Sequence, residues 1–212
     1  VARGPRLLLE KETLDEAELA ELAGAPDGEA RRSSAAWTET GGAAALRSMT
    51  MTDEPVKAGV TLSAPVQHAF RVFAERIGDW WPRTYTFSRD DLAGIAIEPR
   101  AGGHWYEVDR RGRRLDWAEV RAFEPDRRLV LSWAVSADRG QEAPERASEV
   151  EVRFLALGAK LTRVEVEHRG FARHGAGAEL LRGGMASPDG WAYILREYAE
   201  AASPTARAVL SA

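Results

Sequence analysis

The chain has 212 residues, of which 44% are hydrophobic, and carries a formal net charge of −4 at pH 7. It contains no cysteine, which excludes disulfide scaffolds, thiolate catalysis and cysteine-ligated zinc or iron–sulfur sites. No stretch approaches the roughly 20 continuous apolar residues of a membrane-spanning helix, so we expect a soluble, cytoplasmic protein with no membrane span.

Charge is distributed unevenly along the chain. Of the 29 basic and 33 acidic side chains, residues 1–55 hold 6 and 11, which leaves the remainder close to neutral. A near-neutral domain lacks the basic surface with which proteins bind phosphate backbones. We therefore expect no nucleic-acid partner.

The N-terminal segment predicts one short helix at most. Five leucines fit one helical face, namely Leu7, Leu8, Leu14, Leu19 and Leu22. Residues 23–48 are then rich in Gly, Ala, Ser and Pro and too poor in large apolar side chains to order themselves. Because Met49 and Met51 precede the first predicted strand, we hypothesise that native translation begins at one of them.

These patterns divide the chain into three parts. Residues 1–55 are interpreted as a mobile extension, non-native or disordered, and residues 56–202 as the folded domain. Residues 203–212 are predicted to form a flexible C-terminal tail.

The folded domain begins with a predicted strand and a short pair of helices. Val56–Leu62 alternates apolar and polar residues, as a half-buried strand does. Pro65 suits the first turn of a helix. Apolar residues then recur at helical spacing, at Val66, Ala69, Phe70 and Phe73. A second helical segment from Ile77 ends at Pro82.

Six extended runs follow, separated by turns rich in Gly, Pro or charged residues. They cover residues 92–98, 104–109, 115–123, 129–135, 148–157 and 160–168. The last two runs predict a hairpin around Gly158. Successive strands with short connections favour an antiparallel meander over parallel βαβ units.

The last predicted element is a helix from Pro188 to Ala202, about 22 Å long. Ser187 is its predicted N-cap, and Asp189 suits the positive end of the helix dipole. Its apolar stripe consists of Trp191, Ile194, Leu195 and Tyr198. The sequence therefore predicts an α+β fold, with a curved antiparallel sheet wrapped around one long C-terminal helix and a short N-terminal helical pair.

Several short phrases together resemble one known family. They are GGHW (Gly102–Trp105), EPDRRLVLSW (Glu124–Trp133), EHRG (Glu167–Gly170) and SPDGW (Ser187–Trp191). In this order and spacing they resemble the SRPBCC (START-like) superfamily, in the group of homologues of the heat-shock-protein-90 ATPase activator. The resemblance does not reach residues 1–55.

The resemblance implies a helix-grip (START-like) fold with an internal cavity. It does not imply ATP hydrolysis, because the ATPase in the family description is the chaperone, and no GxxxxGK[ST] phosphate loop is present. We expect the domain to bind a small hydrophobic or amphipathic ligand in the cavity.

Two other functions stay open. By family analogy the domain would be a co-chaperone-like interaction module, with a chaperone or another protein as partner. Because relatives resembling polyketide cyclases and dehydratases use cavity acids and bases, a cofactor-free enzyme using cavity carboxylates is the other alternative. Unpaired buried carboxylates would favour the enzyme, and an exposed apolar patch over a filled core would favour interaction.

Nine residues are candidates for the cavity wall: Trp81, Tyr85, Trp105, Glu107, Trp117, Glu119, Trp133, His168 and Trp191. The tryptophans fit core packing and a pocket wall equally well, because in this fold the two surfaces largely coincide. No catalytic residue is assigned, since no nucleophile–base arrangement is visible.

Strand alternation decides what we expect of the polar candidates. Glu107 and Glu119 share faces with nearby tryptophans and would be buried if those rings point inward. We instead expect both carboxylates to be solvated or paired with arginine. His168 is predicted to point inward as a hydrogen-bonded structural histidine, with a ligand-binding or proton-transfer role as the alternative. Metal-ligand spacings are absent, so we expect neither metal nor cofactor.

Overall fold

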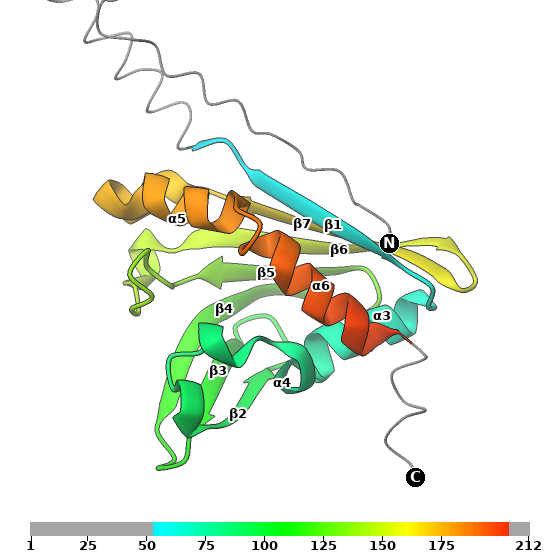
Figure 1. Cartoon of the computed structure of the whole chain (residues 1–212), viewed down its shortest axis with the longest axis horizontal. Helices are drawn as coiled ribbons and strands as arrows, with labels where there is room; N and C mark the ends of the chain where they lie inside the picture. The colour runs from blue at the N-terminus through cyan, green and yellow to red at the C-terminus, as the bar shows by residue number, and fades with distance from the viewer. Residues whose placement is uncertain (1–52, 204–212) are drawn as a thin grey trace, which may run out of the picture. The chain divides into compact units, whose positions relative to one another are not determined.

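A seven-stranded antiparallel sheet, with helices packed across one face, forms the part of the chain that the computed structural model describes, residues 53–203 (Figure 1). The predicted N-terminal extension up to residue 52, including the possible starts at Met49 and Met51, lies outside the described residues. The predicted tail beyond residue 203 does so too.

The strands follow the predicted runs closely. They are β1 (Val56–Leu62), β2 (Leu92–Ile97), β3 (His104–Asp109), β4 (Arg114–Glu124), β5 (Arg128–Trp133), β6 (Ser148–Gly158) and β7 (Leu161–Arg169). Their order in the sheet is β1-β7-β6-β5-β4-β3-β2, and all six pairings are antiparallel. The predicted meander is therefore confirmed, with β1 added beside β7 at one edge.

Two groups of helices cover the inner face of the sheet. The predicted N-terminal pair is confirmed as α3 (Val66–Glu75) and α4 (Ile77–Trp80). The C-terminal group comprises α5 (Ala178–Ala186) and α6 (Trp191–Ala202). Short 3-10 helices occur in the connections, as η2 (Arg83–Tyr85), η3 (Arg89–Asp91), η4 (Pro144–Arg146) and η5 (Phe171–Gly177).

The core lies between the sheet and these helices. Inward-facing residues of β6 and β7 are buried in alternation, as predicted, and include Val150, Val152, Val164 and Val166. The predicted apolar stripe of α6 is buried against them. The Tyr198 hydroxyl donates a hydrogen bond to the Ala69 carbonyl oxygen at 2.8 Å, which ties α6 to α3.

The C-terminal helix begins three residues later than predicted, and a further helix precedes it. Ser187 does not cap α6; its hydroxyl donates to the Gly184 carbonyl at the end of α5, at 2.7 Å. Helix α5 was not predicted, because Gly183 and Gly184 lower the helix propensity of this segment. The two helices meet at Gly190, where an added Cβ would lie 2.2 Å from the Met185 carbonyl oxygen.

A β-bulge interrupts the alternation of β4. Trp105 pairs with Ala118 and Tyr106 with Asp116, so Trp117 has no partner of its own on β3. Trp117 and Ala118 are consequently both buried, and Glu119 is exposed. One extra residue therefore reverses the side-chain direction at Glu119 and Val120.

The helix joint makes a stability prediction. Gly190→Ala should lower the free energy of unfolding by at least about 2 kcal/mol, because backbone atoms block the new methyl group. Gly183→Ala is the matched control, since an added Cβ there would meet nothing within 4 Å. The higher helix propensity of alanine should raise the free energy of unfolding by up to about 1 kcal/mol. Urea unfolding of both variants measures the difference, and equal stabilities would contradict the tight joint.

Candidate functional site

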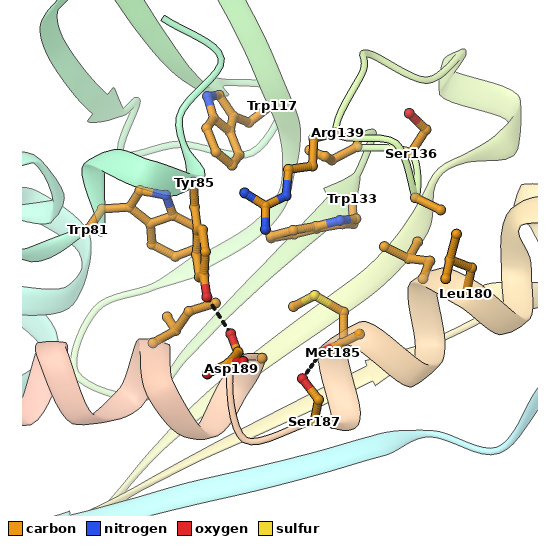
Figure 2. Close-up of a pocket in the computed structure, with 16 residues that line it drawn as sticks. Trp81, Tyr85, Trp117, Trp133, Ser136, Arg139, Leu180, Met185, Ser187 and Asp189 are labelled. Atoms are coloured by element: carbon orange, nitrogen blue, oxygen red, sulfur yellow. Dashed lines mark hydrogen bonds between the residues drawn. The ribbon is translucent and has the colours of Figure 1, made fainter. Parts of the chain in front are cut away.

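A pocket opens where the ends of β4 and β5 face the joint between α5 and α6 (Figure 2). Its volume is about 280 Å³, near the lower end of the range of roughly 300–1,000 Å³ typical of small-molecule sites. One wall is aromatic and comes from Trp81, Tyr85, Trp117 and Trp133. The opposite wall is aliphatic and includes Leu181, Met185 and Ile194.

The aromatic wall is one connected cluster of rings. Trp117 makes edge contacts with Trp81 and Trp133, at centroid distances of 5.6 and 6.3 Å. Trp105 stacks on Trp117 at 5.2 Å and 12°, so it supports the wall from behind and does not line the pocket. These ring contacts join the wall into one continuous aromatic surface.

The aliphatic wall has a gap opposite the tryptophans. Gly184 of α5 lines the pocket, and a Cβ added to it would meet nothing within 4 Å. Leu180 stands at the same wall with 71% of its surface exposed. A larger side chain at position 184 would therefore enter open space beside the pocket.

Polar groups gather at the pocket mouth. The Tyr85 hydroxyl donates to the Asp189 backbone carbonyl at 2.6 Å and so joins η2 to the α5–α6 connection (Figure 2). Burial, and secondly the Asp189 charge, raise the pKa of Tyr85 above its usual value. Tyr85 is therefore a neutral donor near pH 7. The Arg139 guanidinium lies 5.0 Å from the Tyr85 ring centroid.

Glu107 is buried, contrary to the expectation that it would be solvated or paired with arginine. Its carboxylate accepts hydrogen bonds from the backbone N–H groups of Phe87 and Ser88, at 3.0 and 2.6 Å, and from Trp117 Nε1 at 2.9 Å. Three uncharged donors thus replace water around the carboxylate. Glu107 holds the segment between η2 and η3 against the tryptophan cluster, and it does not line the pocket.

Glu119 lies outside the pocket. The bulge at Trp117 turns the Glu119 side chain to the exposed surface, in agreement with the expected solvated carboxylate. The alternative, in which Glu119 follows Trp117 inward, is wrong because strict alternation fails at this point.

His168 and Trp191 are buried behind the pocket wall. Trp191 Nε1 donates to His168 Nδ1 at 3.2 Å, so the imidazole carries its proton on Nε2 and donates to Ser148 Oγ at 2.7 Å. The His168 ring lies 5.4 Å from the Trp133 ring, which separates it from the pocket. The expected structural, hydrogen-bonded histidine agrees with this geometry.

A second buried histidine extends this chain of hydrogen bonds. Ser148 Oγ donates to His174 Nε2 at 2.8 Å, and His174 Nδ1 lies 3.6 Å from a carboxylate oxygen of Glu142. The order Glu142–His174–Ser148 resembles that of an activated nucleophile, but His174 Nδ1 has no hydrogen-bond partner among the described residues. Ser148 is only 1% exposed and does not line the pocket, so its hydroxyl has no access to a substrate there.

Burial keeps both histidines neutral. Loss of hydration lowers the pKa of His168 well below its usual range, and the nearby His174 lowers it further. Burial also lowers the pKa of His174, while the Glu142 carboxylate opposes that shift. The network is therefore built to hold the β6–β7 region to η5 and α6 with uncharged groups.

The structure brings four of the nine predicted residues to the pocket, namely Trp81, Tyr85, Trp117 and Trp133. Sequence reasoning missed the residues contributed by connections and by α5, among them Ser136, Arg139, Met185 and Asp189. The SPDGW phrase around Asp189 was the one available signal. Within residues 53–203, no group of three or more His, Asp or Glu side chains is arranged to hold a metal ion.

Comparisons with known proteins give a family model and a set of similar structures. The model described as Activator of Hsp90 ATPase homolog 1-like protein matches residues 63–201. No curated protein matches the chain significantly. In the described part of the chain, every helix is too short or too polar to cross a membrane.

Three solved structures illustrate the similarity. The anthrahydroquino-γ-pyrone synthase Txn09, complexed with SUM, is 34% identical, with a TM-score of 0.51 over 71% of this chain and 98% of that chain. The self-sacrificing resistance protein CalC from Micromonospora echinospora is 28% identical, with a TM-score of 0.50 over 71% and 95%. Protein MLL2253 from Mesorhizobium loti, 19% identical with a TM-score of 0.50 over 70% and 96%, shows the shared fold alone. These findings confirm the resemblance that the sequence phrases indicated.

The buried carboxylate of Glu107 makes a prediction about stability. Glu107→Gln should lower the free energy of unfolding by about 1–3 kcal/mol, because the amide NH₂ cannot accept the N–H bonds that one carboxylate oxygen now accepts. Urea unfolding measures this loss. Glu119→Gln, at an exposed position on β4, is the control and should be nearly neutral.

The neutral histidines predict how stability depends on pH. Because their folded pKa values lie below the unfolded value of about 6.5, the unfolded state binds more protons and stability falls as pH drops below 6.5. The fall should approach about 1.4 kcal/mol per pH unit for His168. Urea unfolding between pH 7.5 and 5.0 tests this, in a window above the titration of carboxylates. His168→Gln should show a shallower fall; an unchanged slope would contradict the assignment.

Proposed function

Because the chain belongs to the family of Activator of Hsp90 ATPase homolog 1-like proteins, we propose that its pocket binds a small, predominantly apolar, aromatic molecule. The observation that carries the proposal is the pocket between four aromatic rings and the aliphatic side of the α5–α6 joint. Two of the rings come from β4 and β5, and two from η2 and the connection between α4 and η2. Flat rings favour flat ligands, since stacked and edge contacts add to the burial of apolar area.

The polar groups near the pocket support binding over catalysis. The carboxylate of Glu107 accepts three hydrogen bonds behind the wall, Glu119 is exposed elsewhere, and His168 lies behind Trp133. None of these groups lines the pocket. The acid–base chemistry of a cyclase or dehydratase therefore lacks the residues first considered for it.

A second candidate function, a cofactor-free enzyme, is favoured by one observation. The similar structure of highest identity among those described above is a synthase in complex with SUM. An enzyme built on this pocket would act through polar groups that line it, among them Tyr85, Arg139 and Asp189. An interaction module has less support, because only four large apolar side chains among residues 53–203 are exposed. They are Leu155, Leu157 and Leu161 near the β6–β7 turn, and Leu180 beside the pocket.

Binding is tested with the neutral fluorescent probe N-phenyl-1-naphthylamine. The full chain should bind the probe with increased fluorescence, and Gly184→Phe should weaken binding by at least about tenfold because the new ring fills the pocket. The matched control is Gly183→Phe, on the same helix, where an added Cβ also meets nothing within 4 Å and which does not line the pocket.

Both variants replace a glycine within α5, so both should keep or raise stability, and unfolding curves verify this. Absence of probe binding to the unaltered chain would contradict the proposal. Equal binding by the two variants would place the probe elsewhere on the molecule and would contradict it as well.

A further inference from the structure

We propose that the ligand of this pocket carries an acidic oxygen group and that Arg139 binds that group at the mouth. The inference rests on the proposed function and narrows its ligand to a small aromatic acid. It follows from three features of Arg139: its position, the absence of a carboxylate partner, and the chemistry of the surfaces beside it.

The position of Arg139 is fixed by a tight turn between Ser136 and Gly140. The Ser136 N–H donates to the Gly140 carbonyl at 2.9 Å, and the Arg139 N–H donates to the Ser136 carbonyl at 3.0 Å. The Gly140 N–H donates to Ser136 Oγ at 3.0 Å. This turn lines the pocket, and Figure 2 shows the Arg139 side chain reaching from it to the space between Tyr85 and Trp133.

The guanidinium is held in place without being neutralised. One of its nitrogens donates to the Thr84 carbonyl at 3.2 Å, and the group lies over the Tyr85 ring. It forms no ion pair with any carboxylate of residues 53–203. The neighbouring Asp138 carboxylate accepts instead a short hydrogen bond from the Ser136 hydroxyl.

Several arginines on the sheet, by contrast, are paired with carboxylates. On the sheet, Arg153 and Arg169 each contact Glu151 at 3.0 Å. The guanidinium of Arg139 differs because most of its five N–H donors remain available beside an apolar pocket. A carboxylate accepts two such donors in parallel, which fixes its orientation as well as its position.

The opposite side of the mouth carries the opposite charge. Asp189 and Arg139 both line the pocket, and they shift the pKa of Tyr85 in opposite directions, Asp189 upward and Arg139 downward. An anion placed near Asp189 would be repelled. The acid group of the ligand is therefore directed to the 136–140 turn, and its rings extend along the tryptophan wall.

Backbone geometry supports a functional reason for arginine at this position. Arg139 has a φ of 63°, in the left-handed region that favours glycine. Arg139→Gly should therefore fold at least as stably as the parent chain while removing the guanidinium. This variant separates the loss of the charge from any loss of folding.

The test compares two probes of nearly the same shape, 2-naphthoate and its neutral amide, 2-naphthamide. Calorimetric titration of the full chain should show naphthoate binding about fivefold tighter than naphthamide. In Arg139→Gln and Arg139→Gly this preference should vanish while naphthamide still binds. Raising the salt concentration to 0.5 M should reduce the preference in the parent chain only.

Arg71→Gln is the control, at an exposed position of α3 that does not line the pocket, and should keep the preference. Naphthamide binding without any preference for naphthoate would overturn the acid inference and leave the proposed function standing. A preference that survives in both Arg139 variants would overturn the role of Arg139. If both naphthyl probes and N-phenyl-1-naphthylamine fail to bind, the proposed function fails and the inference with it.

Discussion

The close approach of Gly190 to the Met185 carbonyl is the constraint on which the pocket depends. Only a residue without Cβ fits there, so Gly190 allows α5 and α6 to meet closely at a joint. Helix α6 covers the core, where Trp191 and Tyr198 are buried. The joint faces the ends of β4 and β5, and the space left between them is the pocket. A single helix through residues 178–202 would place other side chains at this wall.

Polar residues in this domain serve mainly to fix the pocket walls. Glu107 gathers three N–H donors and so holds the η2–η3 segment against the tryptophan cluster. The two histidines and Ser148 do the same between β6, β7 and η5 with neutral groups. Buried hydrogen bonds of this kind are costly to break, because each leaves an unsatisfied group. The walls are therefore preorganised and apolar, which suits the selective binding of a ligand more than the transfer of protons.

The strands were predictable because one face of each is buried, and a two-residue period then appears in the sequence. Strict alternation would have turned Glu119 inward, and it fails because Trp117 is an extra residue in β4. The bulge cannot be recognised from the sequence, since the residues around it still have the pattern of a strand. The aromatic wall was predictable from its tryptophans, although ring type alone does not separate Trp105 behind the wall from Trp117 within it. Arg139 and Met185 were missed because their places depend on a loop and on a helix containing two glycines, where local propensity carries little information.

The core and the proposed binding site are two sides of the same rings. Trp133 contacts Trp117 along the pocket wall and packs against Trp191 and His168 on its far side. A change at Trp133 would therefore alter folding and binding together, and neither effect could be assigned from it. Effects on binding can be separated from effects on folding at positions that line the pocket without supporting the core. These are Gly184, with open space beside it, and Arg139, which is exposed on its turn. If the proposed function holds, selectivity resides in the connections and in α5, while the tryptophan cluster supplies a common apolar surface.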